Sequence, residues 1–215
     1  MRGAVVLLAI LAGAAPTRAD TPDDSDLVWA GLAMAPPTYF LGVIVHEGSH
    51  ALWAKAYGYE VTRFKILPGR HPQTGAFYFG YTSITGRMPD GEKTWFLLAP
   101  KITDTVLLGG YSLAIGTDTI PDNRYGRLAL AVLATGFWVD FSKDILSFRD
   151  SNDMVRIYNT NGAESEWERL PWRATHLALS VGAAYFIYKG YEGVFEDDDP
   201  EGEARVILPL WHAAF

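Results

Sequence analysis

Two histidines and a glutamate interrupt an otherwise apolar stretch of the chain, VIVHEGSHALWAKAYGYEV, residues 43–61. His46 and His50 are four residues apart, so on a helix their rings lie on one face, one turn above the other. This separation suits two nitrogen bonds to one zinc ion. Glu47 cannot easily bind the same ion, but it can reach a water on it and take its proton. The stretch therefore predicts a zinc site for hydrolysis, and the alternative is a pair of core histidines satisfied by hydrogen bonds.

The composition excludes several other kinds of site. The chain has no cysteine, so it has no disulfide and no thiolate ligand, and any metal must be held by His, Asp or Glu. The net charge of −7 argues against nucleic acid as a partner, because phosphate binding needs a concentrated basic face. With 215 residues, 49% of them apolar, the chain is long enough for one domain with a sizeable core.

The two ends of the chain differ in character from the part between them. Residues 1–19 resemble a secretory signal peptide, with Arg2, then an apolar stretch, then small residues. The alternative is a signal anchor that stays attached. At the other end, residues 191–215 contain EDDDPEGE, which predicts an acidic, solvated tail. The domain between them is expected to span residues 20–190.

Apolar segments long enough to approach membrane-spanning length recur along this domain, which predicts a mainly α fold, a polytopic membrane helix bundle of about four spans. The alternative is a soluble protein with buried core helices. Because Pro36 and Pro37 interrupt the first segment, we expect its helix to begin at Thr38, kinked or broken from what precedes, and to continue to about Tyr57. The four segments are residues 27–45, 94–116, 128–148 and 174–188.

Residues 58–93, after the first span, read as a β-rich loop. YEVTRFKI and GAFYFGYTSI are rich in β-branched and aromatic residues and are separated by turn residues, which predicts a small hairpin or sheet. Together with residues 149–173, this loop holds nine Lys or Arg residues. By the positive-inside rule both segments should face the cytoplasm, with the mature N-terminus outside.

The motif and its surroundings resemble a known family. HEGSHAL in a hydrophobic helix, followed by GYEVTRFKILPG and a strand-forming loop, is similar to the site-2 protease family of intramembrane zinc metalloproteases and their bacterial relatives, over roughly residues 38–157. The resemblance implies that His46, His50 and a later aspartate bind Zn²⁺, and that Glu47 is the general base. It also implies a membrane protein or peptide substrate, cut in or beside the lipid bilayer, and a location in the bacterial inner membrane. Ser49 stands where the family usually has Gly.

The third ligand is less clearly marked. In KDILSFRDSNDMVRI, residues 143–157, Asp153 stands where the family has its ligand aspartate, but the proline and glycine of the family motif are missing. Asp144 falls near the asparagine of that motif, one residue out of register. Depth along the third span favours Asp144 or Asp140 instead, because both would lie level with His46. We expect Asp153, with Asp144 and then Asp140 as alternatives.

The remaining polar residues of the spans are interpreted as an internal charge cluster, because opposite charges in apolar helices are tolerated when they are paired. Lys101 or Lys143 could alternatively stabilise the oxyanion formed during hydrolysis. The other histidines are interpreted as structural or exposed, and the aromatic residues as packing and interface residues. The cluster comprises Lys101, Asp104, Asp140, Lys143 and Asp144; the histidines are His71, His176 and His212; the aromatic residues are Trp95, Phe137 and Trp138.

Three functions follow from these observations. The first is a membrane-embedded zinc metalloendopeptidase, whose substrate would be an extended peptide held by an edge strand of residues 58–93. The second is a catalytically silent metal-binding membrane protein of the same fold. A metal transporter ranks last, because it needs a chain of ligands across the bilayer and the sequence has one cluster.

Overall fold

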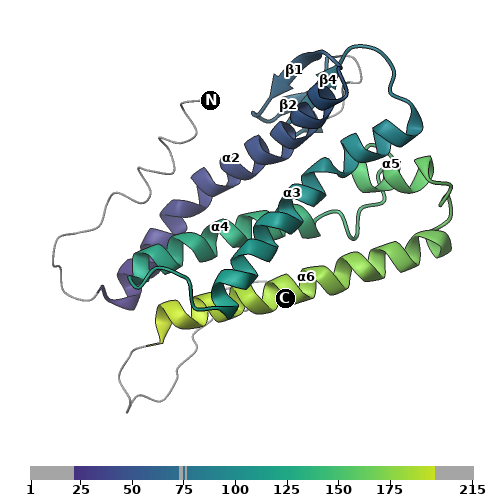
Figure 1. The fold of residues 1–215 in the computed structure, drawn as a ribbon. Helices are drawn as coiled ribbons and strands as arrows, with labels where there is room; N and C mark the ends of the chain where they lie inside the picture. The colour runs from purple at the N-terminus through teal and green to yellow at the C-terminus, as the bar shows by residue number, and fades with distance from the viewer. Residues whose placement is uncertain (1–21, 73–74, 76, 197–215) are drawn as a thin grey trace.

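The computed structural model describes residues 22–72, 75 and 77–196, so the predicted signal peptide and most of the predicted tail lie outside it. The fold is mainly helical with a small antiparallel sheet, as predicted. Long helices run lengthwise through a bundle, and the sheet and a short helix, α5, lie at one end of it (Figure 1). The helices are α2 (Asp24–Ala56), α3 (Asp90–Gly116), α4 (Arg124–Ser142), α5 (Asp153–Thr160) and α6 (Glu166–Phe195).

The helix α2 carries the histidine motif and begins much earlier than expected. The side chain of Asp23 caps it by accepting the backbone N–H of Asp26 at 2.8 Å. From there it continues through Pro36 and Pro37 to Ala56, so the expected start at Thr38 is wrong. Each proline removes only one backbone donor, and both rings are exposed on the helix surface, where no packed neighbour is displaced.

The end of α2 turns the chain directly into the sheet. Gly58 has a φ of +83°, which a glycine adopts without steric cost. Its N–H donates to the carbonyl of Lys55 at 3.0 Å, and the N–H of Tyr59 donates to the carbonyl of Ala54 at 2.9 Å. This is the Schellman pattern, which satisfies carbonyls that the helix end would leave unpaired.

The sheet region contains two short antiparallel pairs. Strand β1 (Val61–Lys65) pairs with β4 (Tyr81–Ile84), with Phe64 opposite Thr82, and β2 (Gly69–Arg70) pairs with β3 (Phe77–Tyr78). A cluster of apolar side chains from α2, the sheet and α3 holds this region against the bundle. Its buried members are Ala54, Met88, Phe96 and Leu97.

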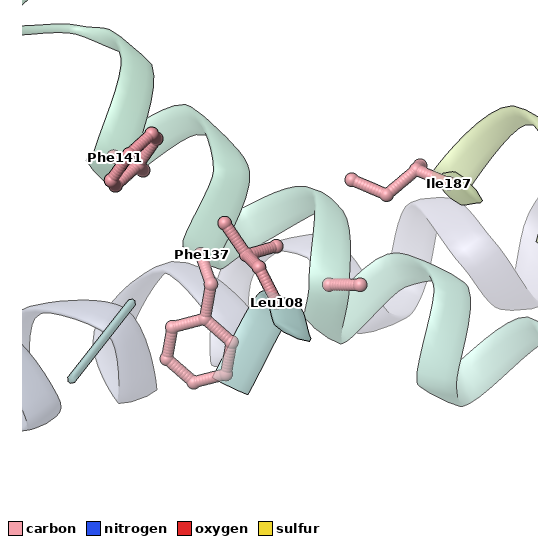
Figure 2. Close-up of a cluster of buried hydrophobic side chains, with 5 residues drawn as sticks. Leu108, Phe137, Phe141 and Ile187 are labelled. Carbon is pink, nitrogen blue, oxygen red and sulfur yellow. The ribbon is translucent and has the colours of Figure 1, made fainter. Parts of the chain in front are cut away.

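The centre of the bundle is an apolar cluster contributed by three helices. Figure 2 shows Phe137 and Phe141 of α4 close to Leu108 of α3 and Ile187 of α6. All four are buried, and Val45 of α2 packs against them one residue before the first motif histidine. The motif therefore lies on α2 between this cluster and the one that holds the sheet region.

Two helices end elsewhere than the apolar segments indicate. The helix α4 stops at Ser142, so the expected third span, residues 128–148, is helical only in its first part. The residues after it form a loop, and Arg173 of α6 donates to the carbonyl of Ser147 in this loop at 2.8 Å. The helix α6 is longer than the expected 174–188, because a capping box between Ser165 and Glu168 starts it at residue 166 and it continues past residue 190.

Of the helices in the described residues, only α2 is long and apolar enough, by length and composition, to cross a membrane. The helix α3 carries Lys101 and Asp104 in its centre, and α4 and α6 carry charged residues near their ends. Most of the apolar part of α2 is exposed or only half-buried against the bundle. The expected bundle of about four spans therefore stays a prediction.

Candidate metal centre

The two motif histidines present the same ring atom to the same point. His46 and His50 lie one turn apart on α2, with ring centroids 5.2 Å apart. The Nδ1 atom of His46 is 2.7 Å from Asp140 Oδ2, and that of His50 is 2.8 Å from the carbonyl oxygen of Phe96. A carbonyl can only accept, so Nδ1 of His50 carries the proton, and the Nε2 of a neutral ring then has a free lone pair. The carboxylate of Asp140 favours the same tautomer in His46.

Asp153 meets both Nε2 atoms. Its Oδ2 is 3.1 Å from Nε2 of His50 and 3.7 Å from Nε2 of His46. In a tetrahedral zinc site with bonds of about 2.0–2.1 Å, ligand atoms lie about 3.3 Å apart. The ligand atoms of the three residues all lie within 4.8 Å of one another, so the group can hold a metal ion.

This convergence has an electrostatic consequence. Two Nε2 lone pairs and one carboxylate oxygen are all acceptors, and acceptors gathered this closely need a positive charge between them. Protons on the rings or a metal ion would supply it. Burial opposes ionisation of Asp153, but the hydrogen bonds and charges of His46 and His50, when their Nε2 atoms are protonated, outweigh it and hold the pKa of the Asp153 carboxyl below its ordinary value. The carboxylate is thus ionised, as a metal ligand must be.

The local sequence explains how Asp153 reaches the site. It is the first residue of α5, and Asn152 caps this helix, accepting the N–H of Met154 at 3.0 Å and that of Val155 at 3.3 Å. Arg156 donates to the Oδ1 of Asp153 at 3.3 Å. The other oxygen, Oδ2, is left facing the histidines.

Asp140 and Asp144, the alternatives to Asp153 as the third ligand, have different neighbours. Asp140 binds the Nδ1 side of His46, opposite the atom that faces Asp153, and also pairs with Lys143. Asp144 lies 2.7 Å from the ammonium of Lys101 and accepts from Asn152. Neither belongs to the group of potential metal ligands found among the described residues.

The expected internal charge cluster is present. Lys101 pairs with Asp104, Asp140 and Asp144, and is only 5% exposed. Lys101 and Lys143 are both engaged by carboxylates, and the oxyanion role considered for them stays a prediction. Nε2 of His176 donates to the carbonyl of Phe141 at 2.8 Å, which makes His176 a structural residue.

Other sequence-predicted residues lie away from the metal centre or outside the description. His71 packs against the rings of Tyr78 and Tyr81 in the sheet region, and His212 lies beyond the described residues. The indole of Trp95 stacks on another ring, and that of Trp138 donates to a backbone carbonyl, as expected for packing residues.

Glu47 lies buried between α2 and the sheet, with 6% of its surface exposed. The hydroxyl of Thr82 in β4 lies 2.9 Å from its Oε2 and 3.0 Å from its backbone carbonyl. Gly80 packs so closely on this region that a Cβ there would lie 2.9 Å from Cγ of Glu47. The sheet therefore determines where the Glu47 carboxylate can point.

Several of these partners have no signal in the motif. The carbonyl of Phe96 and the hydroxyl of Thr82 come from distant segments, and nothing in their local sequence marks them. Asn152 directly before Asp153 is a recognisable helix cap and could have been found. Ser49, which replaces the usual Gly of the similar family, is buried and lies 2.8 Å from the hydroxyl of Thr103, so it joins α2 to α3.

Comparison with protein-family models, curated proteins and solved structures gave no match. The assignment of the metal centre therefore depends on the geometry described above.

Proposed function

We propose that this protein is a membrane-embedded zinc metalloendopeptidase in which His46, His50 and Asp153 hold the ion and Glu47 acts as general base. The observation that carries the proposal is the convergence of two Nε2 atoms and Asp153 Oδ2 on one point, with each Nδ1 atom held by an acceptor. Two imidazoles and one carboxylate form a donor set typical of catalytic zinc, which keeps one position open for water.

The chemistry follows from this arrangement. Bound zinc acts as a Lewis acid that lowers the pKa of a water molecule and polarises the carbonyl of a peptide bond. Glu47 takes the proton of the attacking water and passes it to the leaving amine. Thr82 holds the Glu47 carboxylate by donating to Oε2, and Asp140 and the Phe96 carbonyl hold the two rings in the tautomer that binds metal.

The distribution of side chains supports a membrane environment. Ionisable residues are buried inside the bundle, whereas large apolar side chains are exposed on α2, α3 and α6. An apolar exterior with ionisable groups buried inside fits lipid better than water. We propose that α2, α3, α4 and α6 are embedded, with the end that carries the sheet and α5 facing the cytoplasm. Exposed examples are Trp29, Leu32, Leu52, Val106, Leu113, Leu179 and Val181.

The sheet offers a place for the substrate. Within the described residues β4 pairs only with β1, so its other edge has backbone groups without a strand partner. An extended peptide can add to such an edge by main-chain hydrogen bonds. Because Thr82 of β4 also binds Glu47, a peptide on this edge would lie beside the general base.

The test uses full-length protein purified in detergent. Wild type should contain one zinc ion per chain by elemental mass spectrometry. It should also cleave some peptides from a library of membrane-protein segments, with cleavage detected as new peptide termini. Glu47→Gln should keep its zinc and lose cleavage by at least about 100-fold, whereas His46→Ala should lose both. Cleavage undiminished in Glu47→Gln would refute the mechanism. Zinc binding without any cleavage by wild type would support the catalytically silent metal-binding protein instead.

A further inference from the structure

Lys101 is a buried positive charge near the metal centre. It lies in the middle of α3, is 5% exposed, and has carboxylates on three sides. Its ammonium is 2.7 Å from Asp144 Oδ2 and 3.9 Å from both Asp104 Oδ2 and Asp140 Oδ2. It also donates to the backbone carbonyls of Asp140 and Phe141 at the end of α4. Burying an ammonium group costs free energy unless its charge is paired in this way. Separating Lys101 from these partners is therefore strongly unfavourable.

One of these partners leads to the first motif histidine. Lys101 binds Asp140 through both the carbonyl and the carboxylate of that residue. The same carboxylate accepts from Nδ1 of His46 at 2.7 Å. An imidazole oriented by a carboxylate is a stronger and better-placed metal ligand than one without this partner. Lys101 therefore restrains the residue that orients His46.

A second partner leads to the aspartate ligand. Asp144 accepts from Lys101 through Oδ2 and from the amide of Asn152 through Oδ1, at 2.7 Å in both contacts. The other end of the Asn152 amide caps α5, and Asp153 is the next residue. The position of Asp153 therefore depends on a chain of contacts from Lys101 through Asp144 and Asn152.

We infer that Lys101 is a positioning residue that sets the geometry of the metal centre through two chains of contacts. One chain runs through Asp140 to His46, and the other runs through Asp144 and Asn152 to Asp153. This inference rests on the proposed metal-binding function. Lys101 touches no metal ligand itself. It holds an element on each side of the site, the end of α4 and the start of α5, relative to α3.

A purely structural role for Lys101 predicts a different result from a positioning role. If the ammonium only neutralises buried carboxylates, its removal lowers the stability of the fold without changing the site in the molecules that remain folded. If it positions the ligands, folded molecules bind metal more weakly and with altered ligand geometry. The Kd for metal and the spectrum of a bound cobalt ion, both measured on the folded fraction, distinguish the structural role from the positioning role. A loss of stability alone changes neither of them.

The experiment compares wild type with Lys101→Met, using metal-free protein in detergent titrated with Zn²⁺ against a chromophoric chelator. We expect the Kd for Zn²⁺ to rise about 10–100-fold in Lys101→Met, as for loss of other partners that orient metal ligands. The visible absorption spectrum of the Co²⁺ form should also change in band position or intensity. Lys189→Met, which removes a partly exposed lysine paired with Glu192 on α6, is the matched control and should change neither.

A second variant keeps the test decisive if Lys101→Met does not fold. Lys101→Met combined with Asp144→Asn removes one positive and one negative charge together. This variant should still raise the Kd for Zn²⁺ by about 10-fold or more, because both chains of contacts lose the ammonium. Wild-type affinity and an unchanged Co²⁺ spectrum in the folded variants would overturn the inference while leaving the proposed function intact. Absence of metal binding by wild type would overturn both.

Discussion

Asp140 Oδ2 and His46 Nδ1 are 2.7 Å apart, on the side of the imidazole ring opposite to the atom that faces Asp153. The contact joins α4 to α2 across 94 residues of sequence. It places a carboxylate where it can orient the ring and increase its basicity without competing for the same ion. Asp140 and Asp153 thus have different tasks, although both are aspartates close to one histidine.

Replacing Asp140 should weaken metal binding without abolishing it. Asp140→Ala is expected to raise the Kd for Zn²⁺ by about 10–100-fold, because the ring of His46 loses its acceptor. Asp140→Asn should have a smaller effect, since the amide oxygen still accepts from Nδ1. Chelator competition on the purified protein measures both. A larger loss in Asn than in Ala would contradict this role.

Replacing Asp153 should have a stronger effect than replacing Asp140. We expect Asp153→Ala to raise the Kd for Zn²⁺ by more than about 100-fold, because a direct ligand is removed rather than a residue that orients one. Asp150→Ala, an exposed aspartate in the preceding loop, is the control and should bind normally. If Asp144→Ala released zinc and Asp153→Ala retained it, the third ligand would have been assigned wrongly.

The hydroxyl of Thr82 should matter for turnover and not for metal content. Thr82→Val removes the donor to Glu47 Oε2 with little change in shape. We expect kcat to fall about 10-fold, the order of one positioning hydrogen bond of about 1.4 kcal/mol, at unchanged zinc stoichiometry. The matched control is Thr62→Val on the neighbouring strand β1, where the exposed hydroxyl donates to the carbonyl of Ser83. Equal activity of the two variants would argue against the role of Thr82.

The close packing of Gly80 against α2 should not tolerate a side chain. A Cβ at this position would lie 2.8 Å from Cγ1 of Val43 and 3.0 Å from the carbonyl oxygen of Lys65, so the sheet must shift away from α2. We expect Gly80→Ala to lower the free energy of unfolding by about 1–3 kcal/mol and to reduce cleavage. Gly91→Ala meets no atom within 4 Å and should be neutral or slightly stabilising. Thermal unfolding of both variants provides the comparison.

The cap of α5 should couple local stability to metal binding. Asn152→Ala is expected to cost about 1 kcal/mol of stability through loss of the cap, and to weaken Zn²⁺ binding because Asp153 loses its fixed position. Ser165→Ala removes the cap of α6 and should cost a similar amount of stability without changing the Kd. The same Kd for both variants would show that the cap does not position the ligand.

The local parts of the site could be predicted from the sequence, and the distant parts could not. The spacing of His46 and His50 is enough to place both rings on one helix face, because only helical geometry is involved. Asp153 was expected only through resemblance to a family, since 103 residues separate it from His50. The carbonyl of Phe96 has no sequence signal at all, because every residue has one.

The helix boundaries show the same division. Two consecutive prolines led to the expectation of a break, but α2 continues through Pro36 and Pro37 because their rings are exposed and the rest of the helix stabilises it. The capping box of Ser165 and Glu168 marks the start of α6 in the sequence, whereas the uncharged segment 174–188 begins well after it. Where α4 ends depends on contacts of the following loop with Arg173, which are tertiary.

The contact between Arg156 and Asp153 determines how many bonds the aspartate can offer. Because the guanidinium donates to Oδ1, Asp153 would offer an ion Oδ2 alone rather than both oxygens. Under the proposed function, two imidazoles and one carboxylate oxygen would hold the ion with fewer than four protein ligands, as catalytic zinc sites do. The arginine would thus favour a reactive centre over a saturated, purely structural one.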